Sequence, residues 1–394
     1  MRPRNVFDIA VVGAGMVGAA AALALARRGL RVALLEEREP ARWDAAAEVD
    51  LRVVALAPSA VDLFGQLGVW EAIRDARAAP YRRMQVWDSG SGAQVGFDAV
   101  DRGEAELGWI VENRLIQHCL WTALQAEANV SLRCPARVVA TEDEGEARVL
   151  RLDDDGKLSA RLVVAADGAA SPLRHLLDIG ASGHVYDQHA LVAHVQTERP
   201  HENTAWQRFL PTGTLAFLPL ADGRCSIVWS LPAEECRRLR ELDADRFLQE
   251  LGCAFDFRLG PVTAVSARAE FPLRLLLADR YIAPRFALIG DAAHVVHPLG
   301  GQGVNLGLRD VSALAEAVSA ARDQGRDIGA ETVLRRYERR RRSDNTVSAW
   351  GFDGINRLFR SELEPLVLVR GLGLRAVNAI GPLKQLFVRH AAGR

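Results

Sequence analysis

A glycine pattern near the N-terminus constrains the fold of this chain more than any other feature of its sequence. An apolar run of strand length, residues 7–12, leads into the pattern, and an Ala/Leu-rich helical segment, residues 16–28, follows it. The glycines are Gly13, Gly15 and Gly18. Between a strand and a helix, the first glycine allows a tight turn, the second lets the backbone approach a pyrophosphate, and the third lets the helix pack on the strand. The segment therefore predicts a dinucleotide-binding turn at a helix N-terminus.

An acidic residue completes this pattern at the end of a second strand. Glu36 directly follows the apolar run at residues 31–35, so we expect a βαβ unit with a parallel sheet. A carboxylate at this place accepts a hydrogen bond from a ribose hydroxyl. Glu37 is the alternative ribose ligand, and glycines that serve packing alone are the alternative to a dinucleotide site.

The composition is that of a globular protein with two or three domains. The chain has 394 residues, of which 49% are hydrophobic and 25% are charged, and these values exclude intrinsic disorder. Its 49 Lys and Arg residues nearly balance its 50 Asp and Glu residues. Because no overall positive field results, we expect no nucleic-acid partner.

The cysteines and the first apolar segment bear on the cellular compartment. Five cysteines are widely spread with no metal-binding spacing, which predicts reduced thiols in a cytoplasmic protein and no metal site. Residues 9–26 carry no charge and could be taken for a signal peptide or a membrane span. The glycine pattern inside this stretch, and the strand that follows it, favour the dinucleotide fold instead.

The residue pattern changes along the chain and predicts a domain built from discontinuous segments. Alternating apolar runs with turn signals, typical of antiparallel strands, dominate residues 190–272, and an α/β pattern returns after residue 279. We expect an α/β fold with a Rossmann-like nucleotide-binding domain, an inserted antiparallel-sheet substrate domain and a helical C-terminus. The expected segments are 1–75, 100–180 and 279–330 for the first domain, 76–99 and 181–278 for the second, and 331–394 for the helical region.

Two later segments place an acidic residue at the carboxyl end of an apolar strand. The first strand ends in Asp167 and Gly168, and the second ends in Gly290 and Asp291. Open α/β sheets bind their ligands at this edge. Together with the glycine pattern, the two segments favour FAD over NAD as the bound dinucleotide.

With these motifs in this order, the chain resembles the single-component flavin-dependent aromatic hydroxylases, which share the fold of para-hydroxybenzoate hydroxylase. Within that family it is most similar to the ubiquinone-biosynthesis hydroxylases, and the similarity spans nearly the whole chain. The middle third, including residues 190–193, looks most like the member that hydroxylates position 5 of a polyprenylphenol. The stretches that carry the similarity are 52–56, 67–70, 111–113, 216–220, 226–230 and 290–307.

The resemblance implies a set of FAD-binding residues. Asp291 would hydrogen-bond the ribityl chain, and the turn from Gly301 to Gly303 would face the flavin pyrimidine at a helix N-terminus. Asp167 and Arg174 would lie where FAD and the nicotinamide donor are handled, and a structural ion pair that fixes the turn is the alternative. The full set is Gly13, Gly15, Gly18, Glu36, Arg52, Gln117, Asp167, Arg174, Gly290, Asp291, Gly301, Gln302, Gly303 and Asn305.

The resemblance also implies the reaction. NAD(P)H would reduce FAD, O₂ would add to give a flavin 4a-hydroperoxide, and the electron-rich ring of a phenol would attack it. Since the sequence holds no second glycine fingerprint, NAD(P)H is expected to bind only transiently. The catalytic candidates are His297, Pro298 and Gly301. His297 is the candidate base because imidazole titrates near neutrality, and a histidine that fixes the turn is the alternative.

Two alternating strands provide the candidate substrate pocket. Their predicted lining residues are Leu215, Phe217, Pro219 and Trp229. Ordinary core packing is the alternative for each of these side chains. No evident Arg/Ser/Tyr set for a carboxylate lies on these strands, which favours a neutral, apolar ring as substrate.

The C-terminal region is basic and also carries apolar stretches. The run of arginines at 335–342 precedes apolar segments at 366–369 and 386–388. Docking of this region on anionic lipid is one interpretation. A solvated helix face, with an apolar side packed on the body or on a sister subunit, is the other.

These observations predict an FAD-dependent monooxygenase that uses NAD(P)H and O₂ to hydroxylate the ring of a polyprenylphenol or polyprenyl-benzoquinol in ubiquinone biosynthesis. A cytoplasmic enzyme with peripheral membrane contact is expected, as a homo-oligomer or within a biosynthetic complex. The alternatives are a flavin hydroxylase of a small soluble phenol and a non-catalytic FAD-binding accessory subunit of a quinone-biosynthesis complex.

Overall fold

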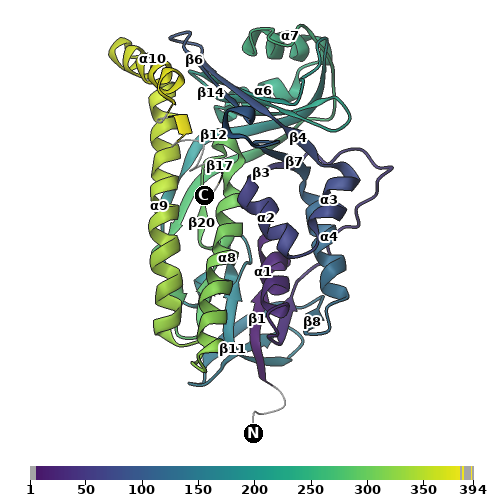
Figure 1. Cartoon of the computed structure of the whole chain (residues 1–394), viewed down its shortest axis with the longest axis vertical. Coiled ribbons are helices and arrows are strands. Elements are labelled where there is room, and N and C mark those ends of the chain that lie inside the picture. The colour runs from purple at the N-terminus through teal and green to yellow at the C-terminus, as the bar shows by residue number, and fades with distance from the viewer. Residues whose placement is uncertain (1–5, 382–383, 386–391, 393–394) are drawn as a thin grey trace.

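The computed structural model describes residues 6–381, 384–385 and 392. Two large sheets lie one beyond the other along the long axis of the molecule, and helices flank them (Figure 1). The sheet at the lower end of Figure 1 contains the N-terminal strand β1, and the sheet at the upper end comes mainly from the middle of the chain.

The lower sheet has eight strands, and its central strands are parallel. Their spatial order is β19, β11, β1, β2 and β8. The parallel strands are β1 (Val6–Val12), β2 (Val32–Leu35), β8 (Val130–Arg133), β11 (Lys157–Ala165) and β19 (Phe286–Leu288). The antiparallel additions are β9 (Val138–Asp143), β10 (Arg148–Leu152) and β18 (Ile282–Ala283).

The register of these strands brings the sequence motifs to one edge. Val12 pairs with Leu35 on one side and with Ala165 on the other, and Ala165 in turn pairs with Leu288. Since the strands are parallel, the segments that follow their carboxyl ends emerge together. The glycine turn and the segments after β2, β11 and β19 therefore form one cluster.

Helix α1 (Met16–Ala26) explains why this part of the chain is so rich in alanine. Every residue from Gly18 to Ala26 is buried. The short side chains let α1 pack closely between the sheet and its neighbours α4 (Asn113–Gln125) and α8 (Gln302–Asp323). The shorter helices of this part are α2 (Pro58–Gln66), α3 (Trp70–Arg77) and α5 (Pro172–Leu176).

The upper sheet has nine strands and is antiparallel except where β13 runs parallel to β5. Its strands are β5 (Arg83–Asp88), β6 (Gln94–Asp98), β12 (Ala181–Thr197), β13 (Thr204–Leu210), β14 (Gly213–Pro219), β15 (Cys225–Leu231), β16 (Val262–Val265), β17 (Ala269–Ala278) and β20 (His294–Val295). A small sheet of β3 (Val53–Leu56), β7 (Gly108–Glu112) and β4 (Ala79–Tyr81) is separate from both. Short 3-10 turns are η1 (Val100–Arg102), η2 (Gly290–Ala292) and η3 (Leu299–Gly301).

The two faces of the upper sheet have different roles. One face packs against α6 (Ala233–Glu241) and α7 (Ala244–Ala254) around a core that includes Phe217, Phe247 and Phe255. The other face borders a cavity, described below, that it shares with β3 and the start of α8.

Two helices form the C-terminal region. Helix α9 (Glu331–Arg360) runs beside both sheets, and α10 (Glu364–Ala379) follows at the upper end (Figure 1). The thirty residues of α9 span about 45 Å, so its arginine run and α10 lie far apart. The apolar segment 386–388 lies outside the described residues.

The predicted α/β fold, with its inserted antiparallel sheet and helical C-terminus, is confirmed. Within the described part of the chain, no helix combines the length and the apolar character needed to cross a membrane.

Candidate active site

The glycine turn is shaped to accept a phosphate group. Gly13 has a φ of +99°, and a side chain there would collide with the backbone of Ala166. A Cβ on Gly18 would collide with the carbonyl oxygen of Gly13, whereas a Cβ on Gly15 would meet no described atom within 4 Å. The N-terminus of α1 has no side-chain cap and no acidic residue in its first turn among the described residues. Its backbone N–H groups are therefore available to an anion at Gly15.

Glu36 and Gln117 both contact the glycine turn. The Ala14 N–H donates to Oε2 of Glu36 at 2.5 Å, and Nε2 of Gln117 donates to the Ala14 carbonyl at 2.8 Å. Glu37 is exposed and pairs with Arg137 at 3.6 Å, away from the turn. The geometry thus favours Glu36 over Glu37 as the ribose ligand.

The Asp-Gly segment after β11 is a rigid turn. Asp167 accepts hydrogen bonds from the Ser171 hydroxyl at 2.6 Å and from the Leu173 N–H at 3.0 Å. The buried guanidinium of Arg174 donates to the carbonyls of Ala292 and Ala169 at 2.8 and 3.1 Å. Burial raises the pKa of Asp167 despite these hydrogen bonds.

The prediction that Asp167 and Arg174 bind the cofactor stays a prediction. The Arg174 guanidinium joins the turn after β11 to the turn after β19 through its two hydrogen bonds to carbonyls. The alternative, a structural role that fixes the turn, agrees with these contacts, because Arg174 donates to carbonyls on both turns and its charge attracts Asp167.

A buried ionic network holds the Gly-Asp turn after β19. Gly290 adopts a φ of +59°, and its N–H donates to Asp310 at 3.0 Å. The same carboxylate accepts from Nε2 of His294 at 2.6 Å and from Nε of Arg341 at 2.8 Å. Burial by itself would raise the pKa of Asp310, but His294 and Arg341 outweigh it and lower the pKa to about 2. Asp310 and Arg341 were not predicted, because neither belongs to a short motif with Gly290.

Asp291 follows Gly290 in the same turn. The residue is exposed, although desolvation by the surrounding protein raises the pKa of its carboxyl. His294, Arg52 and Arg274 partly offset that rise. Asp291 is therefore an acceptor open to a ligand, as its predicted contact with a ribityl chain requires.

The turn before α8 provides a second helix N-terminus. Gly301 has a φ of +65° and caps α8, whose first turn carries no acidic residue and no side-chain cap in the described chain. Asn305 donates to the carbonyls of Ala55 and Gly301 and accepts from the Ala57 N–H at 2.9 Å. The amide of Asn305, a predicted cofactor ligand, is thus engaged in fixing the turn. Gln302 begins α8.

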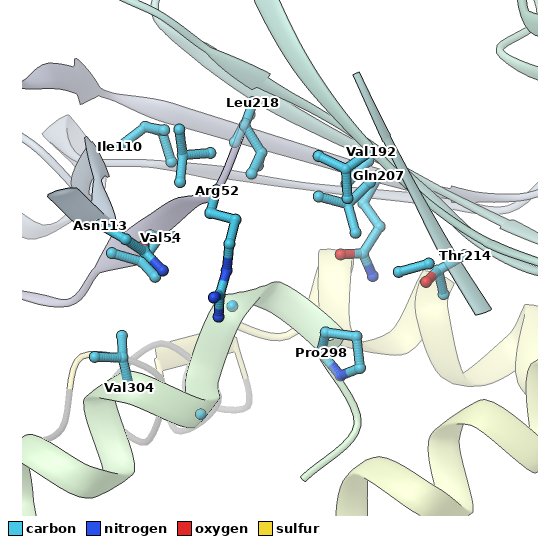
Figure 2. Close-up of a pocket in the computed structure, with 18 of the residues that line it drawn as sticks. Arg52, Val54, Ile110, Asn113, Val192, Gln207, Thr214, Leu218, Pro298 and Val304 are labelled. Carbon is cyan, nitrogen blue, oxygen red and sulfur yellow. The ribbon is translucent and has the colours of Figure 1, made fainter. Parts of the chain in front are cut away.

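A cavity of about 350 Å³ separates this turn from the upper sheet. Figure 2 shows its walls: β3 and β7 on one side, β12 to β14 on another, and the turn before α8 below. Most of the lining is aliphatic, with a few polar side chains among it. The residues labelled in Figure 2 are Arg52, Val54, Ile110, Asn113, Val192, Gln207, Thr214, Leu218, Pro298 and Val304.

The predicted substrate residues lie on the opposite face of the sheet. Leu215, Phe217 and Trp229 are buried in the core beneath α6 and α7, and Pro219 is buried at the end of β14. The prediction of these four as pocket residues is therefore wrong. The cavity is lined instead by the alternate positions of the same strands, Thr214, Ala216, Leu218 and Val228.

Only two of the three predicted catalytic residues lie at the cavity. Pro298 and Gly301 line the cavity, but His297 is fully buried with its ring 5.1 Å from that of Tyr186. Neither ring nitrogen of His297 has a hydrogen-bond partner among the described residues, and burial lowers its pKa to about 4. His297 thus lacks both the pKa and the connection that a base for the substrate needs. The alternative, that it fixes the turn through its ring nitrogens, is equally unsupported.

Comparison with known proteins first identifies the class of protein to which the chain belongs. Residues 6–347 match the FAD binding domain family, so the chain belongs to that family. The fold agrees: PqsL of Pseudomonas aeruginosa has a TM-score of 0.76 at 26% identity, over 94% of this chain and 99% of that one. HpxO of Klebsiella pneumoniae, complexed with FAD, has a TM-score of 0.75 at 20% identity, over 98% and 99%. The chain is an FAD-dependent monooxygenase of the aromatic-hydroxylase fold.

The curated relatives identify a group within this family. The chain is 40% identical to 3-demethoxyubiquinol 3-hydroxylase of Escherichia coli (strain K12) over 98% of both chains. It is 35% identical to the ubiquinone biosynthesis monooxygenase COQ6, mitochondrial, of Homo sapiens, over 98% of this chain and 93% of the relative. The chain belongs to the ubiquinone-biosynthesis FAD hydroxylases.

The residues present fit FAD. The open approach at Gly15, the uncapped start of α1 and the exposed residue Asp291 follow one another along the edge of the lower sheet. FAD, reduced by NAD(P)H, supplies the activation of O₂ in this class of enzyme. The start of α8 offers partial positive charge beside the cavity, which favours negative charge on the bound cofactor.

Proposed function

We propose that this enzyme hydroxylates the aromatic ring of a polyprenylated phenol or benzoquinol in ubiquinone biosynthesis. The observation that carries the proposal is the cavity, an aliphatic chamber that reaches the turn before α8 at Pro298 and Gly301. Its apolar walls suit a neutral ring with an alkyl tail, and they exclude water from the reacting atoms.

Two polar side chains on the sheet would orient the ring. Gln207 of β13 and Thr214 of β14 point into the cavity from neighbouring strands (Figure 2). The Gln207 amide can donate a hydrogen bond to a ring oxygen or accept one from a phenol, and the Thr214 hydroxyl, which donates to Ser230 at 3.4 Å, can accept one. Arg52 extends into the cavity from the opposite wall. A ring held between these groups would present one carbon toward Pro298, and this placement selects the position that is oxidised.

Two indications of the ring position disagree. The sequence resemblance predicts position 5, whereas the relative from Escherichia coli is named for position 3. Complementation of bacterial strains blocked at each ubiquinone ring hydroxylation, with mass spectrometry of the lipid extract, tests both. Rescue of one strain assigns the position, and rescue of several shows broad regioselectivity. No rescue by soluble, FAD-loaded protein would favour a soluble phenol or an accessory role.

For access to a membrane-embedded substrate we propose α10 as the peripheral contact. Several large apolar side chains on or beside it are exposed, at 37–66% of their surface: Leu363, Leu366, Leu368, Val369 and Leu372. The predicted lipid contact is the C-terminal region as a whole, and within it the arginine run at 335–342 is less suitable than α10. Arg341 is buried with Asp310, and Arg335 and Arg340 pair with Glu331 and Glu316.

Flotation with lipid vesicles tests this contact. The wild-type chain should float with the vesicles, and a Leu368→Glu, Leu372→Glu variant should not. An Arg335→Glu, Arg336→Glu variant is the matched control. Loss of flotation in the control alone would contradict the proposal for α10.

A further inference from the structure

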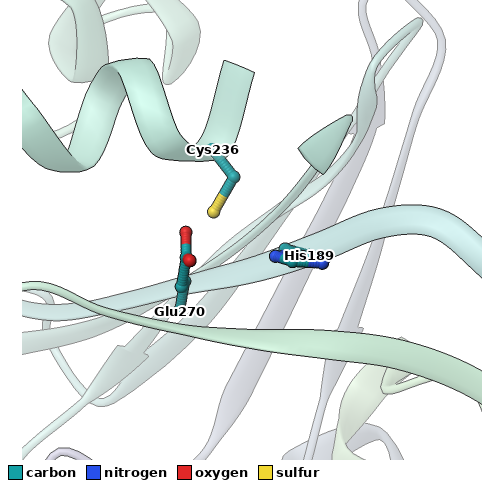
Figure 3. A group of neighbouring side chains, drawn as sticks. All are labelled: His189, Cys236 and Glu270. Carbon is teal, nitrogen blue, oxygen red and sulfur yellow. The ribbon is translucent and has the colours of Figure 1, made fainter. Parts of the chain in front are cut away.

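Three potential metal ligands converge on the reverse face of the upper sheet. The side chains of His189, Cys236 and Glu270 come from β12, α6 and β17, and they point toward one another (Figure 3). One ligand atom from each residue lies within 4.8 Å of the other two. The cluster is separate from the cavity. The cavity is lined by Ala190 and Phe271, which are the sequence neighbours of His189 and Glu270 and point to the other face of the sheet.

The strand register explains the convergence. His189 pairs with Pro272 and Leu191 pairs with Glu270, so His189 and Glu270 are diagonal neighbours on one face of the sheet. Helix α6 lies across that face and places Cys236 above them. Because the positions are set by a sheet and a packed helix, the three side chains are held before any ligand binds.

Two of the ligand atoms, Nδ1 of His189 and Oε2 of Glu270, are buried with no geometric hydrogen-bond partner among the described residues. The Cys236 thiol interacts with the Glu270 carboxylate. The other carboxylate oxygen of Glu270 is engaged by Arg240 at 3.1 Å, and Arg240 is partly exposed. A buried polar atom without a hydrogen-bond partner destabilises the folded protein, and one bound cation would interact with both of these atoms.

We propose that His189, Cys236 and Glu270 bind a Zn²⁺-class transition metal ion. A thiolate, an imidazole and a carboxylate are borderline ligands that suit zinc rather than magnesium or calcium. The thiolate and the carboxylate neutralise the two charges of the ion, and three protein ligands leave a fourth tetrahedral position for water.

Binding releases a proton from the thiol. A cysteine coordinates a metal ion as the thiolate, so a thiol must lose its proton when the ion binds. Formation of the metal–sulfur bond therefore transfers the S–H proton to solvent. The sequence spacing of the five cysteines gave no sign of this site, because its ligands are brought together only by the sheet register.

Metal titration of the FAD-loaded protein, stripped of metal with a chelator, tests the proposal. Zn²⁺ should bind at one equivalent in competition with a chromophoric chelator, and binding should release about one proton. Co²⁺ should produce the visible bands of a tetrahedral thiolate complex at wavelengths beyond the flavin absorption. Mg²⁺ should produce neither effect.

Matched variants assign the ligands. Cys236→Ser should weaken Zn²⁺ binding by more than the roughly 10- to 100-fold loss that follows removal of a hydrogen-bond partner of a metal ligand. Cys253→Ser, which changes an exposed cysteine of α7, should leave Zn²⁺ binding unchanged. Glu270→Gln repeats the test if Cys236→Ser does not fold. Absence of binding by the wild-type chain, or binding that Cys236→Ser and Glu270→Gln leave unchanged, would overturn the proposal.

Discussion

Replacing Asp310 by asparagine should destabilise the protein strongly. Asp310 is fully buried and accepts from Arg341, His294 and the Gly290 N–H. Asparagine keeps the shape but removes the charge, so the buried guanidinium of Arg341 loses its main counter-charge. Breaking a buried ion pair in this way costs about 3–5 kcal/mol. The free energy of unfolding should fall by that amount, and FAD should be released at lower urea concentration.

Asp344→Asn is the matched control. Asp344 contacts the same guanidinium at 2.6 Å, but its side chain is 36% exposed, so water screens the pair. We expect a loss of about 1 kcal/mol or less. Urea unfolding at neutral pH, followed by tryptophan and flavin fluorescence, measures both variants. Equal losses in the two variants would refute the role assigned to Asp310.

The same network predicts a pH dependence. The pKa of Asp310 is lowered from 3.8 to about 2, so its contribution to stability is full above 3.8 and disappears as the pH falls toward 2. The stability difference between the wild-type chain and Asp310→Asn should therefore shrink over this window. A difference that stays constant between pH 4 and pH 2 would contradict the assignment.

Three further predictions concern the site. Ala216→Phe, on the cavity face of β14, should raise KM for the ring substrate in steady-state kinetics. Phe217→Ala, on the core face, should leave KM unchanged and lower the free energy of unfolding in urea by about 3–5 kcal/mol. Gly15→Leu should yield folded protein without FAD, measured as the flavin-to-protein ratio, because its side chain occupies the phosphate approach. His297→Gln should leave the coupling of NAD(P)H consumption to product unchanged, and uncoupling would restore a catalytic role for His297.

The sequence was most informative where function depends on short segments at strand ends. The glycine turn, Glu36 and Asp291 could be placed because each directly follows an apolar strand, and parallel strands bring such segments to one edge. These residues need only local context to be recognised.

The substrate face was missed for a physical reason. Alternation along β14 and β15 identifies two faces but does not say which one meets the core. The bulkier face, with Phe217 and Trp229, fills the space beneath α6 and α7, and the face with Thr214 and Ala216 leaves room for a ligand. The smaller and more polar residues were the signal that could have identified the cavity.

The buried network and the candidate metal cluster could not have been read from the sequence. Asp310 and Arg341 lie 31 residues apart and meet because α8 and α9 pack together. His189 and Glu270 are neighbours only through the antiparallel register of β12 and β17. Both sets depend on tertiary contacts that no local pattern encodes.

The proposed function requires that the chain itself oxidises a polyprenylated aromatic ring. A direct test incubates the FAD-loaded protein with NAD(P)H, a polyprenylphenol in detergent and isotopically labelled O₂, and analyses the lipid by mass spectrometry. We expect a hydroxylated product that carries one labelled oxygen atom, with NAD(P)H consumption stimulated by the phenol. Unlabelled or absent product, with no stimulation by the polyprenylphenol, would contradict it.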